Sequence, residues 1–293
     1  MGWSGKTLIT GSSGQLGRCL AAALRDDALP LPRARLDVTD GAAVRDCIRA
    51  ARPAAVVNCA AWTAVDRAET EPAACRAANE QAVAHLAAAC RETGAWLVQV
   101  STDYVFGGDG GRRVPWREDD LPAPRGVYAA SKLAGEEAAR GWERHQVVRT
   151  CGLYAAGAEG PVRGRNFADT MLVLARDREE VRVVADQHCT PSHVPHVAAA
   201  ILELLATGLP GTFHVTNAGA TTWHGFATEL FRRAGLPTRV VPITSAEYPS
   251  PVPRPAYSVL DGSRLAAAGI TLPDWRVGIA DYLAAGAESP RRS

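Results

Sequence analysis

The chain has 293 residues, of which 47% are hydrophobic and 22% charged, a composition typical of a globular protein with a large core. A formal net charge of +1 gives no electrostatic reason to expect binding to nucleic acid or to an anionic membrane. No apolar run approaches the ~20 residues that span a bilayer, and the N-terminal residues lack a signal-peptide pattern. Seven cysteines without a CxxC pair indicate free thiols, so we expect a cytoplasmic protein.

Up to about residue 150, short apolar runs alternate with segments that favour helices. Strands are predicted over residues 7–10, 54–58, 95–100 and 146–149. Helices are predicted from the glycine-rich turn to about residue 24, and over residues 71–93 and 128–144. Such alternation predicts a parallel sheet with helices on both faces. The expected fold class is therefore α/β, a Rossmann-type doubly wound parallel sheet.

A glycine-rich turn, Gly-Ser-Ser-Gly-Gln-Leu-Gly, follows the first predicted strand and opens the first helix. In such a turn the first glycine permits the bend, and the second lets backbone N–H groups approach a pyrophosphate. The third lets the helix pack close to the strand, and the helix start faces the phosphate charge. A dinucleotide is therefore expected here. The residues predicted to contact it are Gly11, Ser13, Gly14, Gln15, Leu16 and Gly17.

The segment after the second strand distinguishes NADP from NAD, because an arginine there accommodates the extra phosphate of NADP. Arg33 and Arg35 are both candidates for that contact, and Asp37 and Val38 follow at the expected adenine side. The chain is rich in arginine, so two solvent-exposed arginines without a ligand are the alternative. The expected cofactor is NADPH, with NADH as the alternative.

Tyr128 and Lys132 are four residues apart on a predicted helix, so both project from one face. A lysine beside a phenol lowers the pKa of the tyrosine, which can then protonate a carbonyl oxygen as hydride reaches the carbon. Lys132 can also reach the ribose hydroxyls of the cofactor. Thr102 ends the preceding strand, at the edge where doubly wound sheets bind ligands. It is the predicted third catalytic residue, with Ser101 as the alternative.

The second half of the chain is predicted to contain amphipathic helices over residues 166–177, 194–207 and 222–234. Residues 107–124 are a predicted surface loop, and the proline-rich stretch 237–255 is a predicted irregular segment near a cleft. We expect residues 1–150 to form an NADP-binding Rossmann domain. Residues 151–293 are expected to form mainly a smaller substrate-binding lobe, with some segments returning to the Rossmann sheet.

The ordered motifs resemble those of the dTDP-4-dehydrorhamnose reductase family, the RmlD-like extended short-chain reductases of nucleotide-linked deoxysugars. The resemblance covers nearly the whole chain. Its matching segments are residues 11–17, 36–40, 58–66 with Glu69, Asn79, 101–106, 128–136, 148–150, 166–167 with 170–171, 186–187 with Pro191, and 254–255 with Ser258.

This resemblance implies reduction at C4 of a dTDP-4-keto-6-deoxyhexose. Tyr128 would be the proton donor, Lys132 its modulator and Thr102 the hydroxyl beside the carbonyl. The residues implied at the cofactor are Ala60, Ala61 and Trp62. Those implied near the sugar or nucleotide are Thr63, Val65, Asp103, Tyr104, Asn166 and Gln187. The implied partner is a nucleotide sugar, and the chain is expected to be a monomer or a homodimer.

One departure from the family pattern concerns the sugar pocket. Where the family reads Thr-Ser-Trp-Val-Tyr, residues 150–154 read Thr-Cys-Gly-Leu-Tyr. Loss of an indole removes about 150–250 Å² of contact area. Gly152 is therefore expected to border the substrate while leaving room for another sugar or pose. A deoxysugar of antibiotic biosynthesis is thus an open alternative to rhamnose.

A metal is not expected. Some family members dimerise through a metal held by carboxylates, but the corresponding position here is Cys19. His188, Cys189, His193 and His196 could suggest zinc, but their spacing fits no common ligand set. Cleft lining and a helix start are the favoured interpretation of these four residues.

Two competing functions remain: an NADP-binding regulatory subunit without catalysis, and a sugar-nucleotide epimerase or dehydratase of the same fold. The complete set of Thr102, Tyr128 and Lys132 favours an enzyme over a regulator. Asp103 is followed by Tyr104 instead of a second acid, which favours a reductase over a dehydratase.

Overall fold

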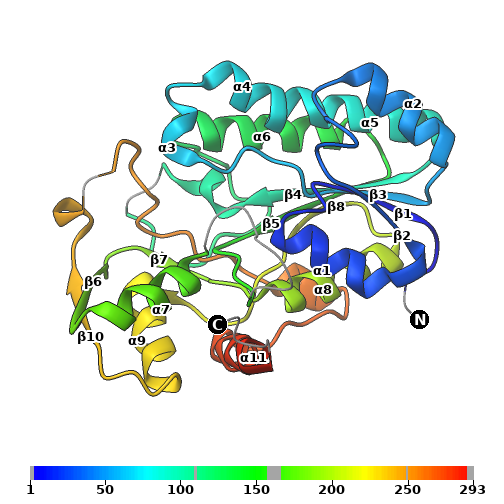
Figure 1. The fold of residues 1–293 in the computed structure, drawn as a ribbon. Helices are drawn as coiled ribbons and strands as arrows, with labels where there is room; N and C mark the ends of the chain where they lie inside the picture. The colour runs from blue at the N-terminus through cyan, green and yellow to red at the C-terminus, as the bar shows by residue number, and fades with distance from the viewer. Residues whose placement is uncertain (1–2, 109–110, 157–165, 249, 289–293) are drawn as a thin grey trace.

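The computed structural model describes residues 3–108, 111–156, 166–248 and 250–288. At its centre lies a six-stranded parallel sheet with the order β2-β1-β3-β4-β5-β8 (Figure 1). Its strands are β1 (Thr7–Thr10), β2 (Ala28–Leu31), β3 (Ala55–Asn58), β4 (Trp96–Thr102), β5 (His145–Thr150) and β8 (Gly211–His214). The predicted α/β fold class is confirmed.

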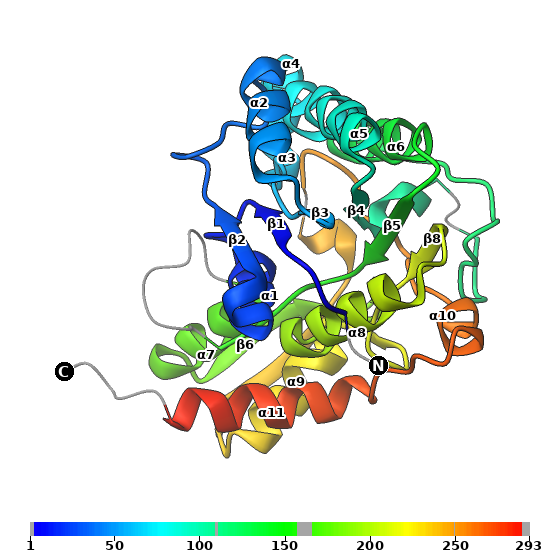
Figure 2. The ribbon, with the colours of Figure 1, turned by 90° about the vertical axis from the view of Figure 1, so that its right-hand side faces the viewer.

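Helices cover both faces of this sheet, as Figure 2 shows. One face carries α1 (Gln15–Leu24) and α8 (Val194–Thr207); the other carries α2 (Gly41–Ala51), α5 (Ala82–Thr93) and α6 (Gly126–Arg140). Successive strand residues point to opposite faces. Leu8 and Val56 therefore pack under α2 and α5, whereas their neighbours Ile9 and Val57 pack against α1 and α8. This double burial is why the strands read as continuous apolar runs.

The direction of strand addition reverses at β1, because β2 lies on one side of it and β3 on the other. In doubly wound sheets the crevice for ligands forms at such a reversal, outside the carboxyl ends of the strands. The glycine-rich turn after β1 and the segment after β3 therefore meet at this edge.

Elements of the second half form a smaller lobe beyond α1 and α8 (Figures 1 and 2). They are α7 (Phe167–Asp177), β6 (Glu180–Val184), β7 (His188–Cys189), β9 (Thr221–Thr222), α9 (Trp223–Arg233), β10 (Arg239–Ile243) and α11 (Trp275–Glu288). Here β6 pairs with β10 in parallel, and β7 pairs with β9 antiparallel. Tyr154, Phe226 and Trp275 lie in the core of this lobe. By contrast α8, β8 and the short α10 (Ser263–Ala267) lie with the large sheet.

The predicted helix over residues 71–93 is interrupted. It comprises α4 (Pro72–Arg76), a π-helical turn over Ala77–Gln81, and α5, which ends at the left-handed Gly94. A further short helix, α3 (Val65–Ala68), precedes it. The π turn holds the buried Asn79, whose amide bonds are described below. Such single-turn π bulges often accompany functional sites.

Two other boundaries differ from prediction. The helix predicted over residues 128–144 begins at Gly126 and ends at Arg140, before Gly141. The proline-rich segment 237–255 is partly regular, since β10 contains Pro242 and lies in a two-stranded sheet, where every strand is an edge and proline is tolerated. Pro249, and residues 109–110 of the predicted loop, lie outside the described residues.

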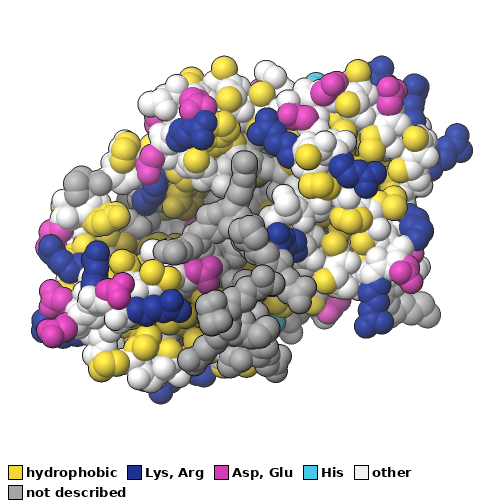
Figure 3. All heavy atoms as spheres, viewed as in Figure 1, with side chains coloured by type: hydrophobic (Ala, Val, Ile, Leu, Met, Phe, Trp, Pro, Cys, Tyr) yellow, Lys and Arg dark blue, Asp and Glu magenta, His cyan; other side chains and the backbone are white. Residues whose placement is uncertain are grey.

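Among the described helices, none combines the length and apolar character needed to cross a membrane. Figure 3 shows basic and acidic side chains interspersed over the described part of one face, without a large area of one sign.

Candidate active site

The glycine-rich turn is closed so tightly that side chains are excluded at two positions. Gly11 has a φ of +61°, and a Cβ there would lie 2.6 Å from the backbone nitrogen of Ala60. A Cβ on Gly17 would lie 2.7 Å from the carbonyl oxygen of Gly11. The turn after β1 thus contacts the segment after β3, and α1 packs directly on the turn. These are the roles expected of the first and third glycines.

The start of α1 is suited to an anion. Gly14 is the N-cap and offers no side-chain acceptor to the free N–H groups of the first turn. Ser13 and Gly14 are exposed, whereas Leu16 is buried in the core against α8. Leu16 can therefore present only its backbone to a ligand.

The loop after β2 holds an ordered arginine. Nη2 of Arg33 donates to Oδ2 of Asp37 at 3.1 Å, and the other carboxylate oxygen of Asp37 accepts from Thr39 N at 3.0 Å. The bonds from Thr39, then the Arg33 charge, lower the pKa of Asp37. Arg35 is exposed beside this pair, and the Val38 side chain is buried. Asp37, expected near the adenine, thus orients Arg33.

The segment after β3 is fixed by two buried amides. Oδ1 of Asn58 accepts from Ala60 N at 3.2 Å. The amide of Asn79 accepts from Trp62 N at 2.8 Å and donates to the Trp62 carbonyl at 3.1 Å and to Ser131 on α6 at 3.0 Å. Through Asn79, the predicted cofactor segment 60–62 is therefore tied to the helix that carries Tyr128. Ala61 and Thr63 are exposed, and Val65 begins α3.

The two hydroxyls at the end of β4 have different partners. Ser101 donates to Oε1 of the buried Glu136 at 2.5 Å. Thr102 instead interacts with the phenol of Tyr128, an interaction that lowers the phenol's pKa. Thr102, and not the alternative Ser101, is therefore the hydroxyl beside Tyr128.

Tyr128 and Lys132 have different hydrogen-bond partners in this structure. Burial raises the pKa of the Tyr128 phenol, and Lys132 does not offset it. Nζ of Lys132 instead donates to the carbonyl oxygen of Val100 at 2.7 Å. Burial also lowers the pKa of Lys132 to about 8. Desolvation thus dominates the pKa of both groups in this structure, and the lowering of the phenol pKa by Lys132 stays a prediction.

Two carboxylates that motif reasoning did not assign a role anchor α6. Oε1 of Glu69 accepts from Val127 N, in the first turn of the helix, at 2.6 Å. Glu136 pairs with the fully buried Arg149 of β5, with Nη2 to Oε2 at 2.8 Å and Nε to Oε1 at 3.0 Å. These contacts fix the helix at its start and middle, on either side of Tyr128 and Lys132. Both residues lie in segments that match the family pattern, but the sequence alone gave no indication of the groups that they bond.

A buried acid, Asp103, contacts the predicted catalytic hydroxyl of Thr102. Asp103 accepts from Ser258 at 2.5 Å and from Thr102 at 3.2 Å, and burial raises its pKa above the usual range. The ring of Tyr104 meets that of Tyr128 edge-on at 5.9 Å. Asp103 and Tyr104, both expected near the substrate, therefore surround the predicted proton donor.

Two other predicted substrate residues are engaged within the protein. Nδ2 of Asn166 donates to Oε1 of Gln15 at 3.1 Å and to the Ala155 carbonyl at 2.8 Å, while its Oδ1 caps α7 by accepting from Asp169 N. Nε2 of Gln187 donates to Ser245 at 2.9 Å. Asn166 therefore joins the glycine-rich turn to the second lobe, and both N–H groups of its amide are used within the protein.

The expectation that Gly152 leaves an open space is wrong. Gly152 has a φ of +50°, and a Cβ there would lie 2.8 Å from Cη2 of Trp223 and 3.3 Å from Cα of Pro191. An indole from α9, distant in sequence, thus reaches the position next to Gly152. The sequence could not show this, because residues 152 and 223 are brought together only by the packing of the second lobe.

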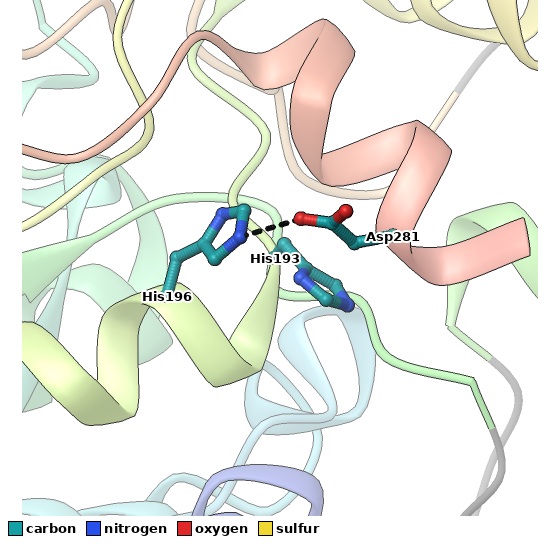
Figure 4. A group of neighbouring side chains, drawn as sticks. All are labelled: His193, His196 and Asp281. Atoms are coloured by element: carbon teal, nitrogen blue, oxygen red, sulfur yellow. Dashed lines mark hydrogen bonds and ion pairs between the residues drawn. The ribbon is translucent and has the colours of Figure 1, made fainter. Parts of the chain in front are cut away.

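The histidines considered as zinc ligands separate into different environments. His188 is exposed and Cys189 buried, whereas His193 and His196 lie together with Asp281 of α11 (Figure 4). Nε2 of His196 is 2.9 Å from Oδ2 of Asp281, and its Nδ1 is 2.9 Å from Nδ2 of Asn217.

The amide of Asn217 decides the protonation of this cluster. Its Oδ1 accepts from His193 N and its Nδ2 donates to the Pro273 carbonyl, so its orientation is fixed. Nδ2 must therefore donate to Nδ1 of His196, which places the His196 proton on Nε2, toward Asp281. In this arrangement the cluster is a hydrogen-bonded contact between α8 and α11.

A glycine turn at the reversal of a parallel sheet, with Thr102, Tyr128 and Lys132 at the same edge, defines the class of extended short-chain dehydrogenases/reductases. Comparison with known proteins agrees. The family model described as RmlD substrate binding domain matches residues 5–287. The chain therefore belongs to the RmlD family, and the resemblance expected from its motifs is confirmed.

Individual relatives are similar over nearly their full length. A dTDP-4-dehydrorhamnose reductase of Streptomyces griseus is 48% identical over 94% of this chain and 91% of its own. A probable dTDP-4,6-dihydroxy-2-methyloxan-3-one 4-ketoreductase of Streptomyces antibioticus is 42% identical over 92% and 91%. The crystal structure of dTDP-4-dehydrorhamnose reductase from Bacillus anthracis in complex with NADP has a TM-score of 0.91 and 35% identity, covering 97% of this chain and 100% of that one.

Proposed function

We propose that this chain is an NADPH-dependent reductase that reduces the C4 keto group of a dTDP-4-keto-6-deoxyhexose. The observation that carries the proposal is the convergence of Thr102 and Tyr128 at the sheet edge that also carries the glycine-rich turn. The names of the relatives supply the substrate class, and the Bacillus anthracis structure supplies the cofactor.

The residues present fit a dinucleotide. A pyrophosphate suits the turn, because Gly11 and Gly17 carry no Cβ atoms and the start of α1 is uncapped. A ribose phosphate suits Arg33, whose guanidinium is paired with Asp37. When bound, NADPH supplies the hydride. We propose cofactor contacts from Gly11, Ser13, Gly14, Gln15, Leu16, Gly17, Arg33, Arg35, Asp37, Val38, Ala60, Ala61, Trp62, Tyr128 and Lys132. Leu16 and Val38 would contribute backbone groups, because their side chains are buried.

In this proposal Tyr128 donates its phenolic proton to the C4 oxygen. Burial raises the pKa of that phenol, so Tyr128 is protonated at neutral pH and ready to donate. The Thr102 hydroxyl stabilises the negative charge that develops on the phenol oxygen. Lys132 lies four residues after Tyr128 on the same helix. In this proposal its ammonium group binds the cofactor ribose and lies on the path by which the proton moves. Thr63, Val65, Asp103, Tyr104 and Gly152 would surround the substrate.

We further propose that residues 1–150 mainly bind the cofactor and residues 151–293 mainly the nucleotide sugar, with α8 and β8 returning to the large sheet. A cytoplasmic location and a monomer or homodimer are part of the same proposal. A deoxysugar other than rhamnose is kept as the alternative product, because the Streptomyces antibioticus relative is named as the 4-ketoreductase of a different dTDP-linked sugar.

The test is NADPH oxidation, followed by its absorbance, with dTDP-4-keto-6-deoxy sugars generated in place, and NMR of the product. Turnover with a new C4 hydroxyl supports the reductase, and the C4 configuration identifies the sugar. Tight NADPH binding without turnover of any such sugar would overturn the proposal and favour a regulatory subunit.

A further inference from the structure

Gly152 and Trp223 form a steric pair at the carboxyl edge of the large sheet. Cη2 of Trp223 lies 2.8 Å from the position that a Cβ on residue 152 would take, so any other residue at 152 would displace the indole. The left-handed φ of Gly152 adds strain to every such substitution. Gly152 is therefore needed to admit Trp223.

The tip of this indole lies at the end of the strand that pairs with β4. Thr150 and Thr102 are register partners on β5 and β4, and Gly152 follows Thr150 by two residues. Between them, the thiol of Cys151 hydrogen-bonds Asp103, which itself accepts from Thr102. Trp223 thus reaches, from the second lobe, the strand end beside the hydroxyl that contacts Tyr128.

The indole is also part of an aromatic surface on the cofactor side. Its ring lies 4.6 Å from that of Phe167, the first residue of α7, and both rings are partly exposed. The preceding residue, Asn166, bonds to Gln15 of the glycine-rich turn. The two rings therefore link the neighbourhood of the turn to the end of β5.

We infer that Trp223 determines sugar specificity by packing against the apolar face of the 6-deoxyhexose, and that Gly152 makes this possible. The inference rests on the proposed function. A 6-deoxy sugar carries a methyl group in place of a hydroxymethyl group, and aromatic faces pack well against such apolar groups.

The experiment compares Trp223→Ala, Trp223→Phe and Gly152→Ala with the wild-type protein. Calorimetry measures the Kd of dTDP-rhamnose and of dTDP alone for each protein loaded with NADP⁺. Trp223→Ala should weaken dTDP-rhamnose binding by roughly tenfold or more, with dTDP binding unchanged, and Trp223→Phe should restore part of the loss. Gly152→Ala should weaken the binding of dTDP-rhamnose when it is introduced into the wild-type protein. The same substitution should have a much smaller effect when it is introduced into Trp223→Ala. Trp142→Phe, at an indole that bonds to Ala95 on the far side of the sheet, is the matched control.

Three outcomes are decisive. Equal loss for dTDP and dTDP-rhamnose would overturn the inference, because the indole would then support the lobe and not the sugar. Unchanged binding of both ligands to Trp223→Ala would also overturn it. Absence of turnover by the wild-type protein would instead refute the proposed function, whatever the binding data for Trp223 show.

Discussion

Arg149 and Glu136 form a two-pronged ion pair in the interior of the large sheet, with side chains 1% and 0% exposed. Ser101 and Arg140 complete the bonds of the carboxylate at 2.5 and 2.7 Å. The pair joins β5, β4 and α6 directly beneath Lys132. A buried pair of this kind adds little net stability, yet loss of Arg149 removes the two-pronged partner of a buried carboxylate and leaves the more exposed Arg140 to compensate its charge.

Arg149→Met should therefore lower the free energy of unfolding by about 3–5 kcal/mol. Urea unfolding followed by circular dichroism measures the change. Arg182→Met is the control, because Arg182 forms an exposed pair with Glu247, whose loss should cost about 0–1 kcal/mol. If both substitutions cost the same, the buried pair does not anchor α6 in the way described.

Tyr128→Phe should reduce kcat by roughly 10²–10⁴-fold, because the phenyl ring cannot donate a proton to the C4 oxygen. The KM for NADPH should change little, since the ring and its contact with Tyr104 are retained. Steady-state kinetics and fluorescence titration with NADPH separate the two effects. Tyr248→Phe, at a ring 69% exposed, is the control and should keep wild-type turnover. Wild-type kcat in Tyr128→Phe would refute the assignment of the proton donor.

Arg33→Ala and Arg35→Ala should each raise the KM for NADPH more than that for NADH. Loss of a hydrogen-bonded charge contact to the ribose phosphate corresponds to about tenfold or more, and NADH lacks that phosphate. The effect of Arg33→Ala should be the larger, because Asp37 already orients Arg33. The ratio of the two KM values in each variant is the measurement, with the remote Arg182→Ala as control. Equal effects on both cofactors would mean that these arginines belong to the solvent surface.

His214 should make the fold sensitive to acid. Its Nδ1 donates to the Asp261 carbonyl at 3.2 Å, and its Nε2 lies 3.5 Å from Nη1 of Arg149. The neutral ring satisfies both contacts, whereas a second proton on Nε2 would face the positive charge of the guanidinium. Burial, then the Arg149 charge, lowers the pKa of His214 to about 3, from 6.5. At pH values between about 3 and 6.5, His214 is therefore protonated in the unfolded chain and neutral in the folded chain. The free energy of unfolding should therefore fall as the pH drops below 6.5, by at most about 1.4 kcal/mol per pH unit.

The measurement is urea unfolding at several pH values between 4 and about 7 for the wild type and His214→Gln. Glutamine can donate to Asp261 and accept from Arg149 without titrating, so the difference between the two proteins isolates His214. Parallel pH dependence in both would show that other groups account for the loss.

The sequence predicted what depends on local pattern. Strands that are buried on both faces of the sheet, such as β1 and β3, appear in the sequence as continuous apolar runs. The glycine-rich turn and the spacing of Tyr128 and Lys132 predicted which edge of the sheet carries the candidate site. Contacts between distant residues were not predictable. Trp223 fills the space beside Gly152 only because β7 and β9 pair, and a residue-by-residue reading of position 152 suggested an opening instead.

Asn166 shows a second limit of such reasoning. The family pattern suggested that Asn166 contacts the sugar, whereas in the structure its side chain caps α7, a common role for an asparagine before a helix. The pairing of β10 with β6 was also hidden, because Pro242 and its neighbouring prolines indicated irregular structure.

The amide of Gln15 gives the molecule a built-in route for thermodynamic linkage. Its Oε1 accepts from Ala155 N and from Asn166 Nδ2, both at 3.1 Å, so the turn expected to cradle one ligand is bonded to the lobe expected to hold the other. Any rearrangement of Gln15 on occupancy of the turn must alter the entry to α7. By reciprocity, each ligand then changes the affinity for its companion by the same factor, and this coupling is carried by a single side chain.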